Sequence, residues 1–389
     1  MSGSADPVLA ARNIAALVWR RAAAVPRRAV RLARRAGRAR QQAALFHAEW
    51  RLHRELAAIA RGRGPIIAGP WLSEVGFEAL YWIPFLRWFE DRYRVDASRV
   101  IAVSRGGVAD WYRDVAHRYV EIFDRVDPAA FARRNEERRQ AHEAGGQKQM
   151  RPSAFDDELV AAALEGAGAR HATVCHPSLM YRLFTPVWLG NRAADVIVRH
   201  ASMAPVRASR PGFDLPRRYM AAKFYTGAAL PDTADCRRAL RELVRQAASR
   251  MPVVMLDTGL ATDEHEDYLF ADIPNVVSVR DRLEPRSNLG VQTSVVAAAQ
   301  GFLGTCGSLA WLAPMLGVPT VAVYADDRLL TTHLYLARQL YRRMDAAPFE
   351  TLDLRAVDAL DAFGVTAPDE GMHGGDGAPH RPSAQEVAP

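Results

Sequence analysis

Residues 302–324 read FLGTCGSLAWLAPMLGVPTVAVY, and this stretch decides the fold. It predicts a short buried strand at 301–304, a tight turn, a helix over 308–316 that ends at Gly317, and a second buried strand at 319–324. No charged residue occurs between Ser287 and Ala325, a length that exceeds the ~18–20 residues of a membrane-spanning helix. Glycines and prolines interrupt any such helix, however, and parallel strands covered on both faces also have continuously apolar sequences. We therefore predict a buried α/β segment here.

The same alternation of strand and helix extends in both directions. Beyond residue 216, strands are predicted at 219–224, 252–256, 275–279, 302–303 and 320–324, and helices at 233–250, 290–300, 308–316 and 328–344. Before residue 205, strands are predicted at 65–69, 100–103 and 172–175, and helices at 77–92, 109–144, 156–165 and 179–200. Such alternation is typical of parallel sheets. The predicted fold class is therefore α/β, with two doubly wound, Rossmann-like parallel-sheet domains facing a cleft and a basic N-terminal helical arm before them.

Composition suggests four parts. Residues 1–63 form the arm, 64–205 a first α/β domain, 206–365 a second α/β domain, and 366–389 a Gly/Pro/His-rich tail that we expect to be disordered. The polar segment 204–216 holds three prolines and is predicted to link the two domains.

Overall composition excludes several classes of protein. Of the 389 residues, 49% are hydrophobic and 24% charged, which excludes a wholly disordered chain. The three cysteines are too few and too far apart for a disulfide scaffold, and no Cys/His cluster has zinc-finger spacing. We therefore expect a cytoplasmic protein.

The positive charge is confined to the arm. Residues 1–63 hold 14 arginines, no lysine and three acids, a net charge of +11, so the other residues must carry −4 of the total of +7. A slightly acidic body is not a nucleic-acid-binding surface.

The arm is predicted to form two helices, 8–24 and 27–61, separated by Pro26. Apolar residues lie on one face and arginines on the others. One interpretation is a basic amphipathic helix on an anionic membrane, which would hold the protein on the inner face of the plasma membrane. The other is a helix that packs on the body of the protein or on a partner.

Candidate ligand-binding residues in the second half follow the carboxyl ends of its strands, where open parallel sheets bind their ligands. The turn from Gly304 to Ser308 joins a strand to a helix, and helix N-termini suit phosphate groups. Lys223 could neutralise a diphosphate, although it could equally be a lysine at a strand edge. The complete set of candidate donor-binding residues is Lys223, Tyr225, Thr226, Asp257, Arg280, Arg282, Thr305, Cys306, Gly307, Ser308 and Leu309.

Two of these positions have ordinary structural alternatives. Ser308 could be a plain helix cap, and Arg280 with Arg282 could form surface ion pairs. Cys306 is not expected to be a nucleophile, because no histidine partner is implied nearby.

Candidate catalytic residues in the first half are Glu74 and Glu78, in the loop after the first strand and in the first turn of the helix that follows. A carboxylate that faces the cleft can deprotonate an acceptor hydroxyl as a general base, and Glu74 is the preferred candidate. Glu78 has a capping role as its alternative. Acceptor-binding candidates are Trp71, Ser73, Gly76, Arg105 and His265, the last in an acidic run (263–267) that we interpret as an exposed loop rather than a metal site.

On these residues the chain resembles the GT-B-fold glycosyltransferases, most closely the heptosyltransferase type. The stretch 302–324, with its glycine turn and its Gly-x-Pro-Thr before the last strand, is similar to their donor-binding half. The segment from Gly69 to Glu78 is similar to their acceptor loop with its carboxylate base. The turn departs from the family pattern at Cys306, where an aspartate is usual, and the family's lysine-bearing loop is not reproduced cleanly around Lys223.

The resemblance implies a glycosyltransferase that uses no metal or other cofactor. It would bind a nucleotide-sugar donor on the second domain and a glycan or lipid-linked acceptor on the first, in bacterial envelope or capsule polysaccharide synthesis. No Asp-x-Asp motif occurs in the chain, and no GxGxxG follows a strand, which disfavours an NAD-dependent oxidoreductase. Two alternatives stay open: a pyruvyl-type group transferase on the same frame, and a catalytically silent nucleotide- or glycan-binding subunit of a synthesis complex.

Overall fold

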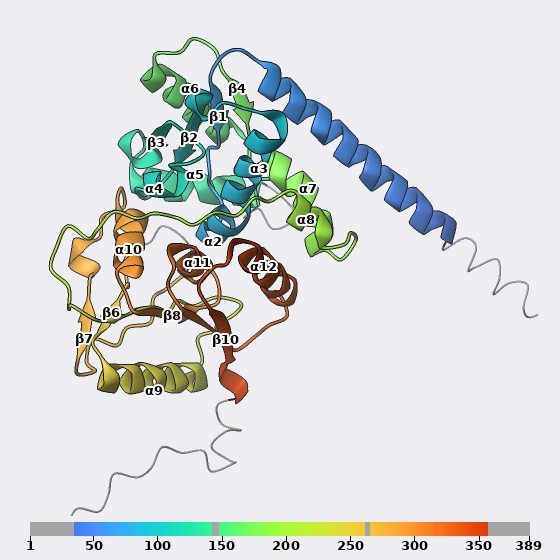
Figure 1. Ribbon diagram of the computed structural model, residues 1–389. Helices are drawn as coiled ribbons and strands as arrows, with labels where there is room; N and C mark the ends of the chain where they lie inside the picture. Colours follow the sequence, from blue (N-terminus) through green and yellow to red (C-terminus); the bar gives the residue numbers. More distant parts are fainter. Residues whose placement is uncertain (1–34, 142–147, 261–264, 357–389) are drawn as a thin grey trace, which may run out of the picture.

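The computed structural model describes residues 35–141, 148–260 and 265–356, which form two α/β domains, each built on one parallel sheet (Figure 1). The first sheet has the strand order β3-β2-β1-β4 and the second β10-β9-β8-β5-β6-β7. Every pairing is parallel, with Ile66 opposite Val100 and Thr173 in the first sheet and Met220 opposite Gly301 in the second. The predicted fold class of two parallel-sheet domains is confirmed.

The first domain surrounds its sheet with helices from one continuous segment. Its strands are β1 (Ile66–Ala68), β2 (Val100–Ser104), β3 (Arg118–Glu121) and β4 (Thr173–Cys175). Its helices are α2 (Val75–Phe77), the π-helical turn η1 (Glu78–Trp82), α3 (Ile83–Tyr93), α4 (Ala109–Tyr112), α5 (Pro128–Gln140), α6 (Ala154–Ala167), α7 (Ser178–Trp188) and α8 (Asp195–Arg199), with short 3-10 turns η2 (Ala97–Arg99) and η3 (Ile122–Asp124). A capping box between Ser153 and Asp156 starts α6.

The second domain repeats the pattern with a larger sheet. Its strands are β5 (Met220–Lys223), β6 (Val253–Met255), β7 (Val276–Ser278), β8 (Gly301–Thr305), β9 (Thr320–Tyr324) and β10 (Phe349–Asp353). Its helices are α9 (Ala234–Arg250), η4 (Arg280–Arg282), α10 (Asn288–Ala297), α11 (Ser308–Leu312), η5 (Ala313–Leu316), α12 (Thr331–Met344) and η6 (Leu354–Ala356). In Figure 1, α9 lies on one side of this sheet, and α10, α11 and α12 lie on the side toward the first domain.

The uncharged stretch 287–325 is buried α/β structure, as predicted, and contains α10, β8, α11, η5 and β9. No helix among the described residues is long and apolar enough to span a membrane. Residues 200–219 contain neither helix nor strand and connect the two sheets, where the linker was predicted.

Two strands were missed by the sequence prediction. The segment 109–144, predicted as one helix, instead contains α4, β3 and α5, and β10 follows α12. Both missed strands lie at sheet edges and are largely half-exposed, so neither has the continuous apolar sequence of a central strand.

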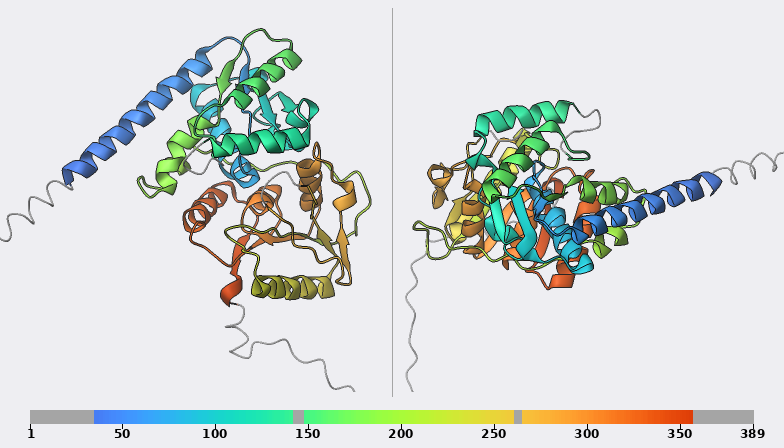
Figure 2. Two further views of the ribbon diagram at one scale, coloured as in Figure 1. Left: turned by 180° about the vertical axis from the view of Figure 1, so that it is seen from behind. Right: turned by 90° about the horizontal axis from the view of Figure 1, so that it is seen from above.

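The arm is helical from residue 35 to 61 in the part that is described. Figures 1 and 2 show this helix running outward from the first domain. Leu52, Leu56 and Ile59 belong to the hydrophobic core, whereas Phe46 and Trp50 are exposed. The last turns of the arm are therefore part of the first domain. The first predicted helix (8–24), the start of the second, and the tail 366–389 lie outside the described residues.

One hydrophobic core continues across both domains. It includes Trp71, Trp82 and Tyr181 of the first domain together with Trp311 and Leu340 of the second. The two domains are consequently packed against each other at the face where the strands of both sheets end.

Candidate active site between the two domains

The loop after β1 meets the turn after β8 at the domain boundary. A Cβ atom on Gly76 would lie 2.7 Å from the backbone nitrogen of Ser308 and 2.8 Å from Cδ1 of Trp311. Only glycine permits this approach of α2 to α11. The predicted acceptor loop and the predicted donor turn are thus brought into direct contact.

Two more contacts hold the domains together nearby. The backbone N–H of Gly290 donates to the carbonyl of Gly106 at 2.9 Å, and the indole N–H of Trp111 donates to Oγ1 of Thr293 at 2.9 Å. The loop after β2 therefore also lies against the second domain.

Glu78 has no exposed surface. Its Oε1 accepts hydrogen bonds from the hydroxyls of Ser104 at 2.5 Å and Tyr112 at 2.6 Å, and its Oε2 has no partner among the described residues. Burial raises the pKa of Glu78 to about 7, against the opposing effects of Arg105 and the two hydroxyls. Because substrate cannot reach this carboxyl group, the structure does not support Glu78 as a catalytic residue; the group instead links η1 to β2 and α4.

Glu74 is half-buried at the position preceding α2, and its side chain does not cap that helix. It lies two residues before Gly76, so it is placed beside the contact between the two domains. Lys148 is close enough for Glu74 to raise its pKa, although burial is the larger effect and lowers it. Of the two carboxylates, only Glu74 has exposed surface.

Arg105 supports the loop that carries Glu74. Its guanidinium donates to the carbonyl oxygens of Trp71 at 3.0 Å and Ser73 at 2.9 Å. Ser73 is itself buried, and Trp71 is fully buried between Trp82 and Tyr181. The structure therefore does not support Trp71 as an acceptor-binding residue, because its ring has no exposed surface.

Lys223 is held by partners within the second domain. Its ammonium donates to the carbonyl of Leu256 at 2.9 Å and to Oδ1 of Asp267 at 3.0 Å, and its side chain is 11% exposed. The other oxygen of Asp267 accepts the N–H of Thr258 at 2.6 Å. Much of the positive charge of Lys223 is therefore already balanced.

Tyr225 connects the ends of β5 and β8. Its N–H donates to Oγ1 of Thr305 at 2.9 Å, and a Cβ atom on Gly307 would lie 2.5 Å from its hydroxyl oxygen. The ring of His265 lies 4.9 Å from the Tyr225 ring, and its Nδ1 is 2.7 Å from the carbonyl of Thr226. His265 thus lies beside the donor-side residues Tyr225 and Thr226, although sequence named it as an acceptor-binding candidate.

The turn itself has a strained residue at its centre. Ser308 has a φ of 38°, a positive value that is uncommon for a residue with a side chain. Cys306 and Leu309 are buried, and burial raises the pKa of the Cys306 thiol to about 12. A thiol with that pKa stays protonated near neutral pH, in keeping with its exclusion as a nucleophile.

Three predicted donor-side residues lie farther along the sheet. Asp257 is buried and accepts the hydroxyl of Ser278 at 2.6 Å. Arg280 is exposed and packs over Gly259, and Arg282 lies 5.8 Å above the ring of Phe213.

His333 and Lys148 were missed by the sequence analysis. Nδ1 of His333, on α12, is 2.6 Å from the hydroxyl of Tyr81, and its ring packs against Phe77 at 5.0 Å. Burial, with a smaller contribution from Lys148, lowers the pKa of His333 to about 4. Lys148 lies 4.9 Å above the ring of Trp188. A single histidine in a helix and an isolated lysine carry no spacing signal, so sequence could not have placed them together.

No family model matches the sequence, and no curated protein matches it. Solved structures with a similar chain path include the glycosyl transferase family 9 from Veillonella parvula, at 10% identity and a TM-score of 0.43 over 80% of this chain and 92% of that one. An E. coli heptosyltransferase with ADP has 13% identity and a TM-score of 0.39, over 77% of this chain and 98% of that one. A putative UDP-N-acetylglucosamine 2-epimerase from Listeria monocytogenes has 11% identity and a TM-score of 0.32, over 80% of this chain and 100% of that one. These TM-scores lie below 0.5, so the likeness alone does not assign a function to this chain.

Proposed function

We propose that this chain is a glycosyltransferase that moves a sugar from a nucleotide sugar to a hydroxyl of a glycan or lipid-linked acceptor. The observation that supports it is the contact of Gly76 with Ser308, which places the half-buried Glu74 beside the glycine turn at the ends of both sheets. Ligands of open parallel sheets bind at these strand ends.

In this proposal Glu74 takes the proton of the acceptor hydroxyl. The acceptor oxygen then bonds to the anomeric carbon as the bond from that carbon to the phosphate oxygen breaks. Negative charge develops on the departing nucleoside diphosphate. The backbone N–H groups at the start of α11 have no partner within their helix and can stabilise this charge.

The donor diphosphate would lie on the side of the turn where Gly307 faces the hydroxyl of Tyr225, because Gly76 covers the other side at Ser308. Lys223 is the last residue of β5, two residues before Tyr225. Its ion pair with Asp267 reduces the positive charge that it can offer to the diphosphate. We propose that backbone and hydroxyl donors do this work and that the transfer needs no metal ion.

We also propose that the enzyme works in the cytoplasm at the inner face of the membrane, on precursors of envelope or capsule polysaccharide. The support is the +11 charge of residues 1–63, which would attract anionic lipid. A lipid-linked acceptor would then be presented to the first domain, from which the arm helix extends.

Calorimetric titration with UDP, GDP, ADP, CMP and dTDP tests the donor site. We expect one nucleotide to bind in the micromolar range and Ser308→Glu to abolish binding by placing a carboxylate at the turn. Ser249→Glu, on the exposed face of α9, is the matched control and should bind normally. Failure of all five nucleotides to bind would overturn the proposal.

Glu74→Gln tests the catalytic step. Release of nucleoside diphosphate from the matching nucleotide sugar, first with water and then with candidate acceptors, should fall by about 100-fold or more while nucleotide binding is retained. Glu242→Gln, at a half-exposed position of α9 on the other side of the second sheet, is the control. Tight binding without turnover in the unmodified protein would instead support the silent binding subunit.

A further inference from the structure

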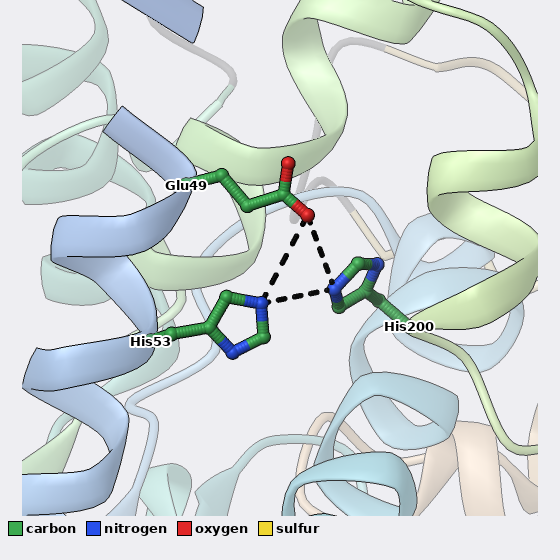
Figure 3. A group of neighbouring side chains, drawn as sticks. All are labelled: Glu49, His53 and His200. Carbon is green, nitrogen blue, oxygen red and sulfur yellow. Dashed lines mark hydrogen bonds and ion pairs between the residues drawn. The ribbon is translucent and has the colours of Figure 1, made fainter. Parts of the chain in front are cut away.

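Three side chains that are distant in sequence meet where the arm joins the first domain (Figure 3). Glu49 and His53 lie one turn apart on the arm helix, and His200 lies at the end of α8. The Nε2 atoms of His53 and His200 are 3.3 Å apart. Oε1 of Glu49 lies 3.6 Å from Nε2 of His200 and 3.9 Å from Nε2 of His53.

Hydrogen bonds at the other ring nitrogens fix which atoms face the centre of the cluster. Nδ1 of His200 is 2.6 Å from the carbonyl of Val196, which can only accept, so this nitrogen carries the proton. The hydroxyl of Tyr93 donates to the carbonyl of His53 at 3.2 Å and lies 2.7 Å from Nδ1 of the same residue. With that proton used on the carbonyl, the hydroxyl can accept from Nδ1 in the His53 tautomer that carries its proton there.

When both rings carry their proton on Nδ1, each imidazole directs an Nε2 lone pair toward the same point. Two lone pairs at 3.3 Å repel each other unless a cation or a proton lies between them. Metal-binding histidines are typically held in this way, with the second ring nitrogen donating to a carbonyl or another oxygen.

The carboxylate is held in place as well. Oε2 of Glu49 pairs with the guanidinium of Arg192 at 2.6 Å, which leaves Oε1 directed at the two rings. The Glu49 side chain is 14% exposed and that of His200 6%, whereas that of His53 is 30% exposed, so an ion has a path from solvent on the His53 side.

The spacing suits a tetrahedral ion. Zinc bonds to nitrogen and oxygen of about 2.0–2.1 Å at tetrahedral angles place ligand atoms about 3.3–3.4 Å apart. The two nitrogens already have this separation, and Glu49 needs a shift of only a few tenths of an ångström. Two imidazoles and one carboxylate are a ligand set for divalent first-row metals of the zinc class.

We propose that Glu49, His53 and His200 bind a zinc ion, with water as the fourth ligand, and that this ion fastens the arm helix to the first domain. This site could not be predicted from sequence, because His53 and His200 are 147 residues apart. The site joins the arm to α8 and is separate from the contact of Gly76 with Ser308, so the ion is structural and the proposed transfer still needs no metal.

Zinc titration of the full chain after EDTA treatment tests the site by calorimetry, with the metal content of the purified protein measured by mass spectrometry. We expect one ion per chain. His53→Gln should weaken binding more than about 100-fold, since loss even of a residue behind the ligands costs 10–100-fold. His47→Gln, on the exposed surface of the same helix, is the control and should bind as the parent does.

Cobalt(II) gives a second readout that does not depend on activity. Its visible absorption should show the intense bands of a four-coordinate ion in the parent and in His47→Gln, and these bands should be absent in Glu49→Gln. Glu49→Gln is chosen because it keeps both imidazole rings and therefore disturbs the packing little. Equal zinc affinity in the parent and His53→Gln, with no four-coordinate cobalt spectrum, would overturn the proposal and leave the two imidazoles sharing a proton.

Discussion

Two buried groups, Glu78 and His333, make the stability of this protein depend on pH in opposite directions. The pKa of Glu78 is raised from 4.5 to about 7, so its contribution is fully present below pH 4.5 and is lost as pH rises through 7. The pKa of His333 is lowered from 6.5 to about 4, so its contribution is fully present above pH 6.5 and is lost as pH falls toward 4. The two effects change the free energy of unfolding with pH in opposite directions and partly cancel. Each one is therefore seen only when the parent is compared with a variant that lacks the group.

We expect Glu78→Gln to remove the loss of stability that Glu78 causes as pH rises. The variant should gain stability relative to the parent between pH 5 and pH 8, by at most about 3 kcal/mol, because the shift of the pKa limits the effect. Urea unfolding at several pH values measures this difference. A difference that stays constant with pH would show that Glu78 is ionised with no penalty in the folded protein.

Gly76→Ala tests the close approach of the two domains. The new methyl group would lie against the backbone of Ser308, and relief requires α2 and α11 to separate. We expect a loss of about 1–3 kcal/mol in the free energy of unfolding. Gly212→Ala, where nothing lies within 4 Å of the added atom, is the control and should change stability little.

At the scale of elements, α12 connects the second domain to the aromatic cluster of the first. His333 reaches Tyr81 at one end of the helix, and the guanidinium of Arg343 donates to the carbonyl of Val198 at 2.8 Å near the other. Protonation of His333 would place a charge beside Lys148 in this half-buried cluster.

Acid should therefore loosen α12. From pH 7 to pH 5 the parent should lose about 1–3 kcal/mol more stability than His333→Gln, which keeps a polar partner for Tyr81. Hydrogen exchange of α12 amides at the two pH values locates the effect. Equal acid sensitivity of parent and variant would count against this role.

Elements with continuous apolar sequence were predictable. The central strands β1, β2, β5, β6, β8 and β9 and most helices appear where the patterns placed them, because burial on both faces gives an unbroken signal. The edge strands β4 and β7 were also predicted, from short apolar runs in their sequences. Edge strands β3 and β10 give no such signal. The site was predictable only as a set of strand ends: sequence placed Glu74 and Ser308 there, but it could not show that Trp71 and Glu78 are inside the core or that His333 crosses between domains.

At the scale of the whole molecule, the charge is divided unequally. The arm's net +11 contrasts with −4 on all other residues, and Leu52, Leu56 and Ile59 fasten the end of the arm to the core. Removal of the entire arm would therefore expose core residues, whereas removal of residues 1–34 leaves that packing intact.

We expect the full chain to bind vesicles containing phosphatidylglycerol, and a variant lacking residues 1–34 to bind them at least about 10-fold more weakly, since each basic residue near the surface contributes about 1 kcal/mol. Added salt should weaken the interaction. Sedimentation with anionic and with zwitterionic vesicles measures both effects. Equal sedimentation of the two proteins would exclude the arm's first half as a lipid-binding segment.

The backbone-to-backbone contacts between the domains also restrict how this chain can evolve. Side chains throughout the two sheets can be exchanged for others of similar size, but Gly76 against Ser308 and Gly290 against Gly107 leave no volume to exchange. Descendants of the same ancestor could therefore lose nearly every other identity and still share glycines at these few points. A sequence search that gives extra weight to those glycines and to their spacing would find homologues whose overall sequence identity is too low to detect.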